Sequence, residues 1–164
     1  VLSDEFKRTA TVQTDSGTEG EQCSLSSFQE ELLQRINEVR GFARFCGGNF
    51  MEPVEPVVWN CELEKAAQVH SNDMATHNFF SHQGSTGLSV NHRVNDVDYE
   101  WSKVSENIAA GHPGIDLVID AWLESPSHCE SVMGPEFEDT AVSLQMSETA
   151  DYPVYWTMIM GLPF

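Results

Sequence analysis

Hydrophobic residues recur at steps of three and four in three stretches of the chain, the spacing that lines one face of an α-helix. The first stretch opens with Ser27 and Glu30, a capping-box pair. Asn60 is a suitable N-cap for the second, and the third covers Ile115–Glu124, before Pro126 interrupts it. The residues expected to face the core are Phe28, Leu32, Ile36, Val39 and Ala43 in the first helix, Leu63, Ala66, Ala67, His70 and Met74 in the second, and Val118, Ala121 and Trp122 in the third.

Alternation of hydrophobic and polar residues predicts strands in the second half of the chain. It occurs at residues 104–109 and 142–146. A third candidate strand covers residues 154–160, where Tyr155, Thr157 and Ile159 alternate with Val154, Trp156, Met158 and Met160, and the last two segments are expected to pair antiparallel through residues 147–153. The segment 49–59 contains two prolines and is expected to be extended or looped. Because helices come first and strands last, we expect an α+β domain arranged as a three-layer sandwich.

The first 22 residues show no hydrophobic periodicity and are rich in Thr, Ser, Gly and acidic residues. A segment of this composition buries too little apolar surface to offset the entropy of folding. We therefore expect residues 1–22 to form a flexible tail and residues 23–164 to form one domain, which fits the usual domain size of about 100–150 residues.

The balance of charge restricts the class of partner. The chain carries 26 acidic and 8 basic residues, a formal net charge of −18, with no basic run. Nucleic acids and anionic membranes bind positive surfaces, so neither is an expected partner. No apolar run reaches the roughly 20 residues of a membrane span. The chain begins at Val1 without a signal peptide, and we expect that a leader has been removed.

Four dispersed cysteines, Cys23, Cys46, Cys61 and Cys129, allow three disulfide pairings. None lies in a C-x-x-C pair, the spacing used by zinc ribbons and thioredoxin-like proteins. Two disulfides in an oxidising compartment fit the even number, and four reduced, buried thiols are the alternative. Disulfides would indicate a secreted, extracellular or periplasmic protein.

Candidate chemistry is concentrated in a few histidines and one glutamate. His82 follows a predicted helix and His128 follows a helix break, positions where functional side chains often lie. Glu106 lies within an apolar segment and requires a partner, because an unpaired buried carboxylate is costly. His70 faces the predicted core and is expected to be a hydrogen-bonded core histidine. Since no H-E-x-x-H motif is present, the ligands of any metal site must be brought together by the fold.

Three sequence motifs follow one another along most of the chain. They are H-S-N-D-M-A with F-F-S-H, which ends at His82, then S-E-N-I-A around Glu106, and W-L-E-S-P-S-H, which ends at His128. In this order they resemble the motifs of the bacterial branch of the CAP superfamily, the cysteine-rich secretory, antigen 5 and pathogenesis-related proteins. The resemblance covers residues 28–161, and Ser105 and Ser127 stand where the family usually has glycine.

This resemblance implies an α-β-α sandwich with a central, mainly antiparallel sheet. It also implies a cleft with two histidines and two acidic residues. The histidines would be His82 and His128, one acid would be Glu106, and Glu124 is the nearest candidate for the second acid. A divalent metal such as zinc is implied between His82 and His128, with Glu106 as a residue that orients a histidine or a bound water.

The resemblance further implies a disulfide pairing. Bacterial relatives with a cysteine directly after the cleft histidine, here Cys129, often carry another after the first helix, here Cys46. The remaining pair is then Cys23 and Cys61.

Three functions stay open for a domain of this kind, because a fold does not determine a function. The preferred one is a secreted, monomeric, non-catalytic binding protein for a lipid, a small apolar ligand or an envelope component. The second is a metal-dependent hydrolase that uses His82, Glu106 and His128. The third is a structural module with a vestigial cleft. Ser81 precedes His82, but sequence neighbours rarely form a nucleophile–base pair.

Overall fold

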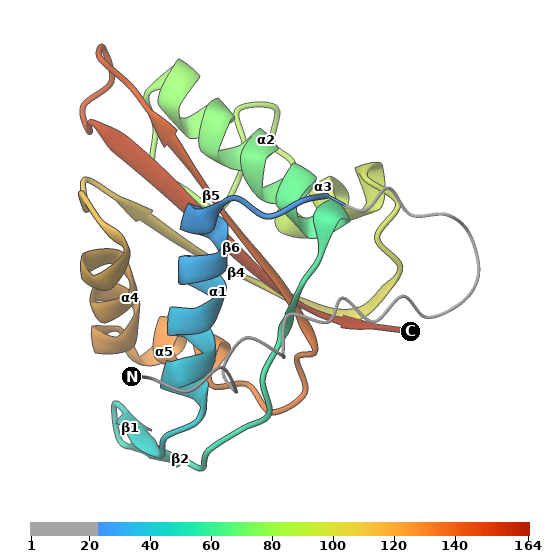
Figure 1. Cartoon of the computed structure of the whole chain (residues 1–164). Helices are drawn as coiled ribbons and strands as arrows, with labels where there is room; N and C mark the ends of the chain where they lie inside the picture. The colour runs from blue at the N-terminus through green and yellow to red at the C-terminus, as the bar shows by residue number, and fades with distance from the viewer. Residues whose placement is uncertain (1–22) are drawn as a thin grey trace.

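The computed structural model describes residues 23–164, so the prediction of a tail over residues 1–22 lies outside the described residues. Figure 1 shows the path of the chain. The described helices are α1 (Ser27–Arg40), α2 (Cys61–His77), α3 (Val90–Asp96), α4 (Ile115–Glu124) and α5 (Pro126–Val132). The described strands are β1 (Arg44–Cys46), β2 (Asn49–Met51), β3 (Val58–Trp59), β4 (Trp101–Ala110), β5 (Asp139–Met146) and β6 (Val154–Pro163).

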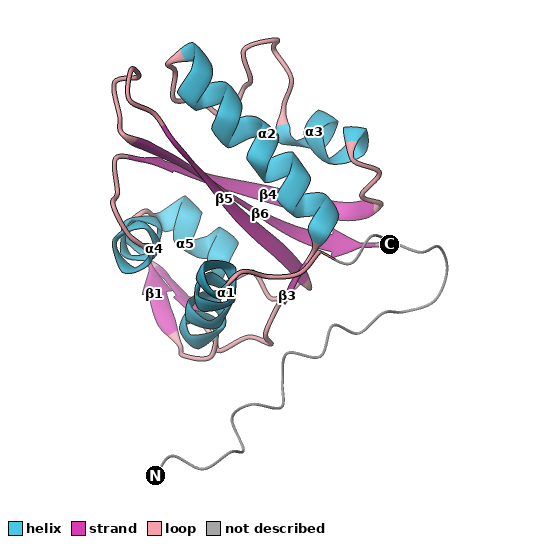
Figure 2. Ribbon diagram, turned by 45° about the horizontal axis from the view of Figure 1, so that its top comes forward, coloured by secondary structure: helices cyan, strands magenta, loops and turns pink. Residues whose placement is uncertain are grey.

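The centre of the molecule is a four-stranded sheet in the order β3-β5-β6-β4. The pairs β5–β6 and β6–β4 are antiparallel, and the short β3 is parallel to β5. Helices α2 and α3 cover one face of this sheet, and α1, α4 and α5 lie on the other (Figure 2). The expected three-layer α-β-α sandwich with a mainly antiparallel sheet is therefore confirmed.

Helices α2 and α4 match the sequence pattern closely. Asn60 caps α2, its Oδ1 accepting the Leu63 N–H at 2.9 Å, and Asn78 ends the helix in the left-handed conformation. Along the inner face of α2, all five predicted residues are buried. The predicted start of α1 is wrong by one residue. Ser26, with extended backbone, and Gln29 form the capping box in place of Ser27 and Glu30, because only the residue before the first helical turn presents its Oγ to the free N–H groups.

The sequence pattern missed three short elements. The β1–β2 hairpin was not foreseen, although β2 lies in the segment expected to be extended or looped, and neither were α3 and α5. Pro126 does end α4, but it also starts α5, where a proline costs nothing because its missing N–H would have no partner. Ala43 was wrongly assigned to the inner face of the first helix. The helix ends at Arg40, and Ala43 is exposed.

Both disulfides form as the family resemblance implied. Cys23 pairs with Cys61 and Cys46 pairs with Cys129, and no cysteine is free in the described residues. The alternative of four reduced thiols is therefore wrong. The first bridge ties the segment before α1 to the start of α2. The second ties the β1–β2 hairpin to α5, the helix that carries His128.

The core lies on both faces of the sheet, and β6 is buried along most of its length. A charged residue, Arg40, is also completely buried there, and it donates hydrogen bonds to the carbonyl oxygens of Glu55, Val132, Gly134 and Phe137.

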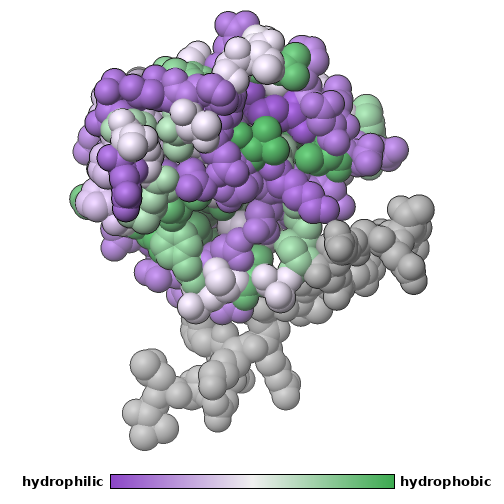
Figure 3. Space-filling model, turned by 90° about the horizontal axis from the view of Figure 1, so that it is seen from above, coloured by the Kyte–Doolittle hydropathy of each residue, from purple (hydrophilic) through white to green (hydrophobic). Residues whose placement is uncertain are grey.

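The face of the molecule in Figure 3 is largely hydrophilic, with scattered hydrophobic residues between. Among the described residues, no helix combines the length and the apolar character that a membrane crossing requires.

Candidate functional site

The candidate site is built around β4, which lies at one edge of the central sheet. Side chains alternate between the two faces of a strand. Glu106 contacts residues that belong to the α2 and α3 side, whereas its neighbours Ser105 and Asn107 contact α5 on the other side. Strand β4 therefore connects two groups of residues that come from opposite layers of the sandwich.

Glu106 is the centre of the polar contacts. Its side chain is only 2% exposed, and both carboxylate oxygens have partners. Oε1 lies 3.0 Å from Nδ1 of His82, and Oε2 accepts a hydrogen bond from Arg93 at 2.5 Å. The partner that the sequence analysis required for this carboxylate is thus Arg93 together with His82.

Arg93 is a site residue that the sequence analysis missed. Its guanidinium is almost completely buried, and it also donates to the carbonyl oxygens of His82 (3.2 Å) and Leu88 (3.0 Å). It therefore holds both the backbone of His82 and the carboxylate of Glu106. The sequence offered one signal for Arg93. The chain has few basic residues, Arg93 lies 13 positions before Glu106, and a buried carboxylate needs a positive partner.

His70 supports the same group from the inner face of α2. Its Nε2 lies 2.8 Å from the carbonyl oxygen of Ser81 and 3.7 Å from Oε1 of Glu106. Since Nε2 faces two acceptors, it carries the proton, and the buried Nδ1 has no partner. Burial lowers the pKa of His70, against the opposing effect of Glu106. His70 is thus a neutral core histidine, as expected, and it positions the residue before His82.

His128 reaches the site from α5. The side-chain amide of Asn107 donates to the carbonyl oxygen of His128 at 3.1 Å, which fixes this end of α5 against β4. The rings of His82 and His128 lie with their centroids 6.4 Å apart and their planes tilted by 64°. Burial lowers the pKa of His128, and the neighbouring His82 lowers it further. His128 is therefore neutral at pH 7, the form that binds metals.

The fourth predicted residue, Glu124, does not join this group. It is exposed at the end of α4, and no hydrogen bond or ion pair within residues 23–164 links it to His82, Glu106 or His128. The structure thus brings together three of the four candidates from the sequence and adds Arg93 and His70.

His82 and His128 are the two candidate ligands for a metal ion in this group. The proton on Nδ1 of His82 points at a carboxylate, which leaves Nε2 free as a ligand. With Zn–N bonds of about 2.0–2.1 Å and the tetrahedral angles of zinc, two imidazole centroids around one ion lie about 5 Å apart. The rings of His82 and His128, 6.4 Å apart here, would therefore have to approach each other by about 1 Å to share one ion. No group of three His, Cys, Asp or Glu side chains in the described part of the chain is arranged to hold a metal. A metal between His82 and His128 would therefore need ligands from outside the described residues, such as water.

The comparisons with known proteins decide the family. The model of the cysteine-rich secretory protein family, CAP, matches residues 33–160, which is most of the chain. This chain belongs to that family. The CAP domain is 25% identical over 136 residues to the uncharacterized protein YkwD of Bacillus subtilis, a match that covers 83% of this chain and 49% of YkwD. The chain thus spans about half the length of this curated relative.

Solved structures share the fold of this CAP domain. An extracellular protein containing an SCP domain from Bacillus anthracis has a TM-score of 0.63 at 19% identity, covering 85% of this chain and 45% of that one. The structure of NaASP2 with Zn²⁺ has a TM-score of 0.55 at 16% identity, covering 84% of this chain and 80% of that one. At these identities the likeness establishes the α-β-α sandwich alone.

Proposed function

We propose that this CAP domain is a secreted, non-catalytic binding protein whose cleft holds an exchangeable divalent metal, zinc in the first instance, between His82 and His128. The observation that carries the proposal is the contact between Nδ1 of His82 and a carboxylate that Arg93 keeps paired. This contact fixes the tautomer of His82 and leaves its Nε2 unprotonated in a half-exposed position.

Secretion is supported by the two disulfides, which persist in oxidising compartments. It is also supported by the extracellular nature of the structural relative from Bacillus anthracis. The partner would be a lipid, a small apolar ligand or an envelope component. A metal held by two imidazoles supplies a positive coordination point for an oxygen atom of such a ligand.

The contacts of Glu106 favour binding over hydrolysis. A general base must be free to accept a proton from water or substrate. Glu106 is almost fully buried, and its two oxygens are engaged by His82 and Arg93, so it acts by orienting His82. Glu124 does not offer a second carboxylate to the site. The metal-dependent hydrolase, which needs His82, Glu106 and His128 as catalytic groups, is therefore the weaker proposal.

Calorimetric titration of zinc into the purified domain tests the metal site. We expect one equivalent of zinc to bind to the wild type. The zinc affinity should fall by about 100-fold or more in His82→Ala and His128→Ala, and by about 10–100-fold in Glu106→Gln. His77→Ala is the matched control, because His77 is 58% exposed at the end of α2 and belongs to a separate contact with Asp73. Circular dichroism checks that each variant folds. Equal affinity in all five proteins would refute the metal site, and so would the absence of binding to the wild type.

A further inference from the structure

A pocket lies at the other end of β4, five residues before Glu106 and thus roughly 17 Å along the strand. Its volume is about 660 Å³. It is lined by residues from the end of α3, the α3–β4 turn, the start of β4 and the position after β6: Asn95, Asp98, Tyr99, Glu100, Trp101, Ser102 and Phe164. None of the residues of the histidine cleft takes part in it.

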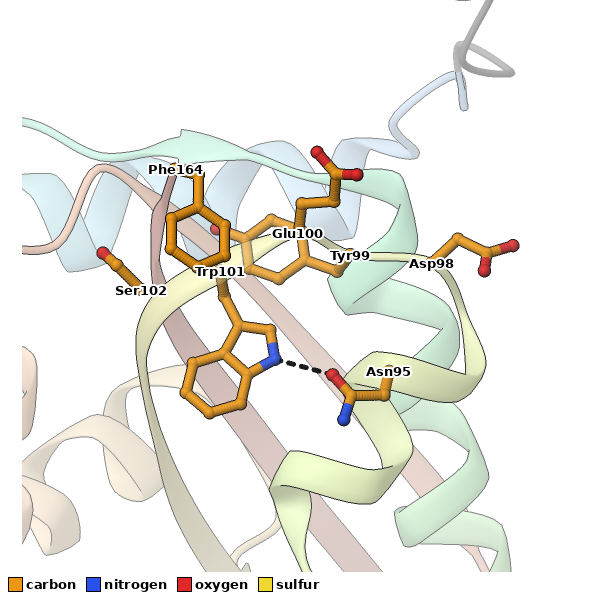
Figure 4. Close-up of a pocket in the computed structure, with 7 residues that line it drawn as sticks. All are labelled: Asn95, Asp98, Tyr99, Glu100, Trp101, Ser102 and Phe164. Carbon is orange, nitrogen blue, oxygen red and sulfur yellow. Dashed lines mark hydrogen bonds between the residues drawn. The ribbon is translucent and has the colours of Figure 1, made fainter.

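Two of the aromatic side chains in this pocket are held in fixed positions. Nε1 of Trp101 donates to Oδ1 of Asn95 at 2.8 Å, and the hydroxyl of Tyr99 donates to Asp139 at 2.8 Å. Gly161 makes room for Tyr99, because a Cβ at this position would lie 2.4 Å from the Tyr99 hydroxyl oxygen. In Figure 4 the rings of Phe164, Tyr99 and Trp101 are grouped at one side of the pocket.

The backbone at this pocket is irregular in two places. Asp98 has a φ of +60°, an unusual conformation for a residue other than glycine, and the β4–β6 register shifts between Trp101 and Lys103. A shift of this kind re-aims the side chains next to it and is common near functional sites. Both features lie beside Trp101 and Glu100, so they determine how these two side chains are presented.

The charge around the pocket is negative and unbalanced. Asp98 and Glu100 line it, the partly buried Asp139 accepts the hydrogen bond of Tyr99, and no lining residue is basic. Burial, together with the charge of Asp139 and of the nearby Glu138 and Glu62, raises the pKa of Tyr99 far above its usual value. A cation entering this pocket would therefore meet a favourable electrostatic potential.

We propose that this pocket binds an alkylammonium group, such as the trimethylammonium group of choline. Aromatic faces attract organic cations through their quadrupole, tryptophan most strongly, and the carboxylates add charge attraction. A metal ion does not fit the same residues, because aromatic faces are not metal ligands. The occupant is thus an organic cation rather than an inorganic one.

The protein supplies its own reporter for this binding. Three of the four tryptophans, Trp59, Trp122 and Trp156, are buried, whereas Trp101 is partly exposed in the pocket. Choline should therefore protect the fluorescence of the wild-type protein from quenching by acrylamide, with saturation at a dissociation constant in the millimolar range, about 1–10 mM. Its neutral isostere 3,3-dimethyl-1-butanol should protect much less, and sodium chloride at equal ionic strength should have no effect.

Saturation-transfer NMR on the choline methyl signal extends the test to variants that lack the reporter. Trp101→Leu and Glu100→Gln should each weaken binding by about fivefold. Phe45→Leu and Glu52→Gln are matched controls on exposed residues outside the pocket and should bind as the wild type does. Co-sedimentation with phosphatidylcholine vesicles would identify a lipid headgroup as the source of the ammonium group, and binding of free choline alone would identify a soluble ligand.

Several results would overturn the proposal. These are equal binding of choline and its neutral isostere, unchanged binding by Trp101→Leu and Glu100→Gln, and no saturable binding up to about 100 mM, well above the expected dissociation constant.

Discussion

Replacing Arg93 by methionine tests how the histidine cleft is held together. The substitution removes the charged partner of Glu106, whose side chain is 2% exposed, and two further hydrogen bonds, to the carbonyl oxygens of His82 and Leu88. Breaking a buried ion pair by removing one partner costs about 3–5 kcal/mol, because the other charge stays buried without compensation. We expect Arg93→Met to lower the free energy of unfolding by this amount.

The double variant Arg93→Met/Glu106→Gln separates this cause from a simple loss of packing. It removes both charges, so its destabilisation should fall below the sum of the two single variants by about 2–3 kcal/mol. Arg35→Met is the matched control. Arg35 forms exposed ion pairs with Glu38 and Asp116, and such pairs contribute about 0–1 kcal/mol.

Urea-induced unfolding followed by circular dichroism measures all four variants against the wild type, provided that the m-value stays constant. The reasoning is refuted if Arg93→Met costs no more than Arg35→Met. It is also refuted if the effects of Arg93→Met and Glu106→Gln are additive, since additivity would show that the two side chains do not depend on one another.

Three further predictions concern stability. Cys46→Ala/Cys129→Ala opens a loop of 83 residues and should cost about 4–5 kcal/mol on the chain-entropy model, measured by urea unfolding. Arg40→Met should cost about 3 kcal/mol in the same assay, because four buried carbonyl oxygens lose their donor; burial lowers the pKa of Arg40 to about 10, so the residue is still charged at neutral pH. His70 and His128 have folded-state pKa values below the unfolded value near 6.5, so the unfolded chain binds more protons below that pH. Thermal unfolding should show stability falling as the pH drops below about 6.5, by up to about 1.4 kcal/mol per pH unit for each histidine, with a smaller slope in His70→Gln.

The long elements of the fold were predictable from the sequence because each has a strong local signal. In α2, a cap at Asn60 and a complete apolar face mark the helix. Alternation over Val142–Met146 marks β5, and a nearly continuous apolar and aromatic run marks β6. Helices α3 and α5 have only seven residues each, which is too short for a hydrophobic period to appear. Their existence depends on packing against β4, which residue spacing does not reveal.

The candidate site was predictable only in part, for a related reason. His82, Glu106 and His128 were found through their motifs, and the fold brings all three together. Arg93 was missed because it lies on α3, which was not foreseen, and its relation to Glu106 arises from tertiary contacts. Glu124 was suggested by the family resemblance as the nearest acid to the expected position, but it is exposed at the end of α4.

The buried polar residues that contact His82 or its neighbour, namely Glu106, Arg93 and His70, are difficult to explain by stability alone. A well-packed apolar substitute for a buried ion pair is often as stable as the pair or more so. Here Glu106 and Arg93 are buried together with His70, whose Nδ1 has no partner, an arrangement that adds desolvation cost. What these residues do achieve is to fix the ring of His82, which is itself 57% exposed and would otherwise rotate freely. An ordered imidazole with a defined tautomer offers its free nitrogen to a ligand at little further entropic cost, so the cost of the buried residues supports the proposal that a ligand binds at His82.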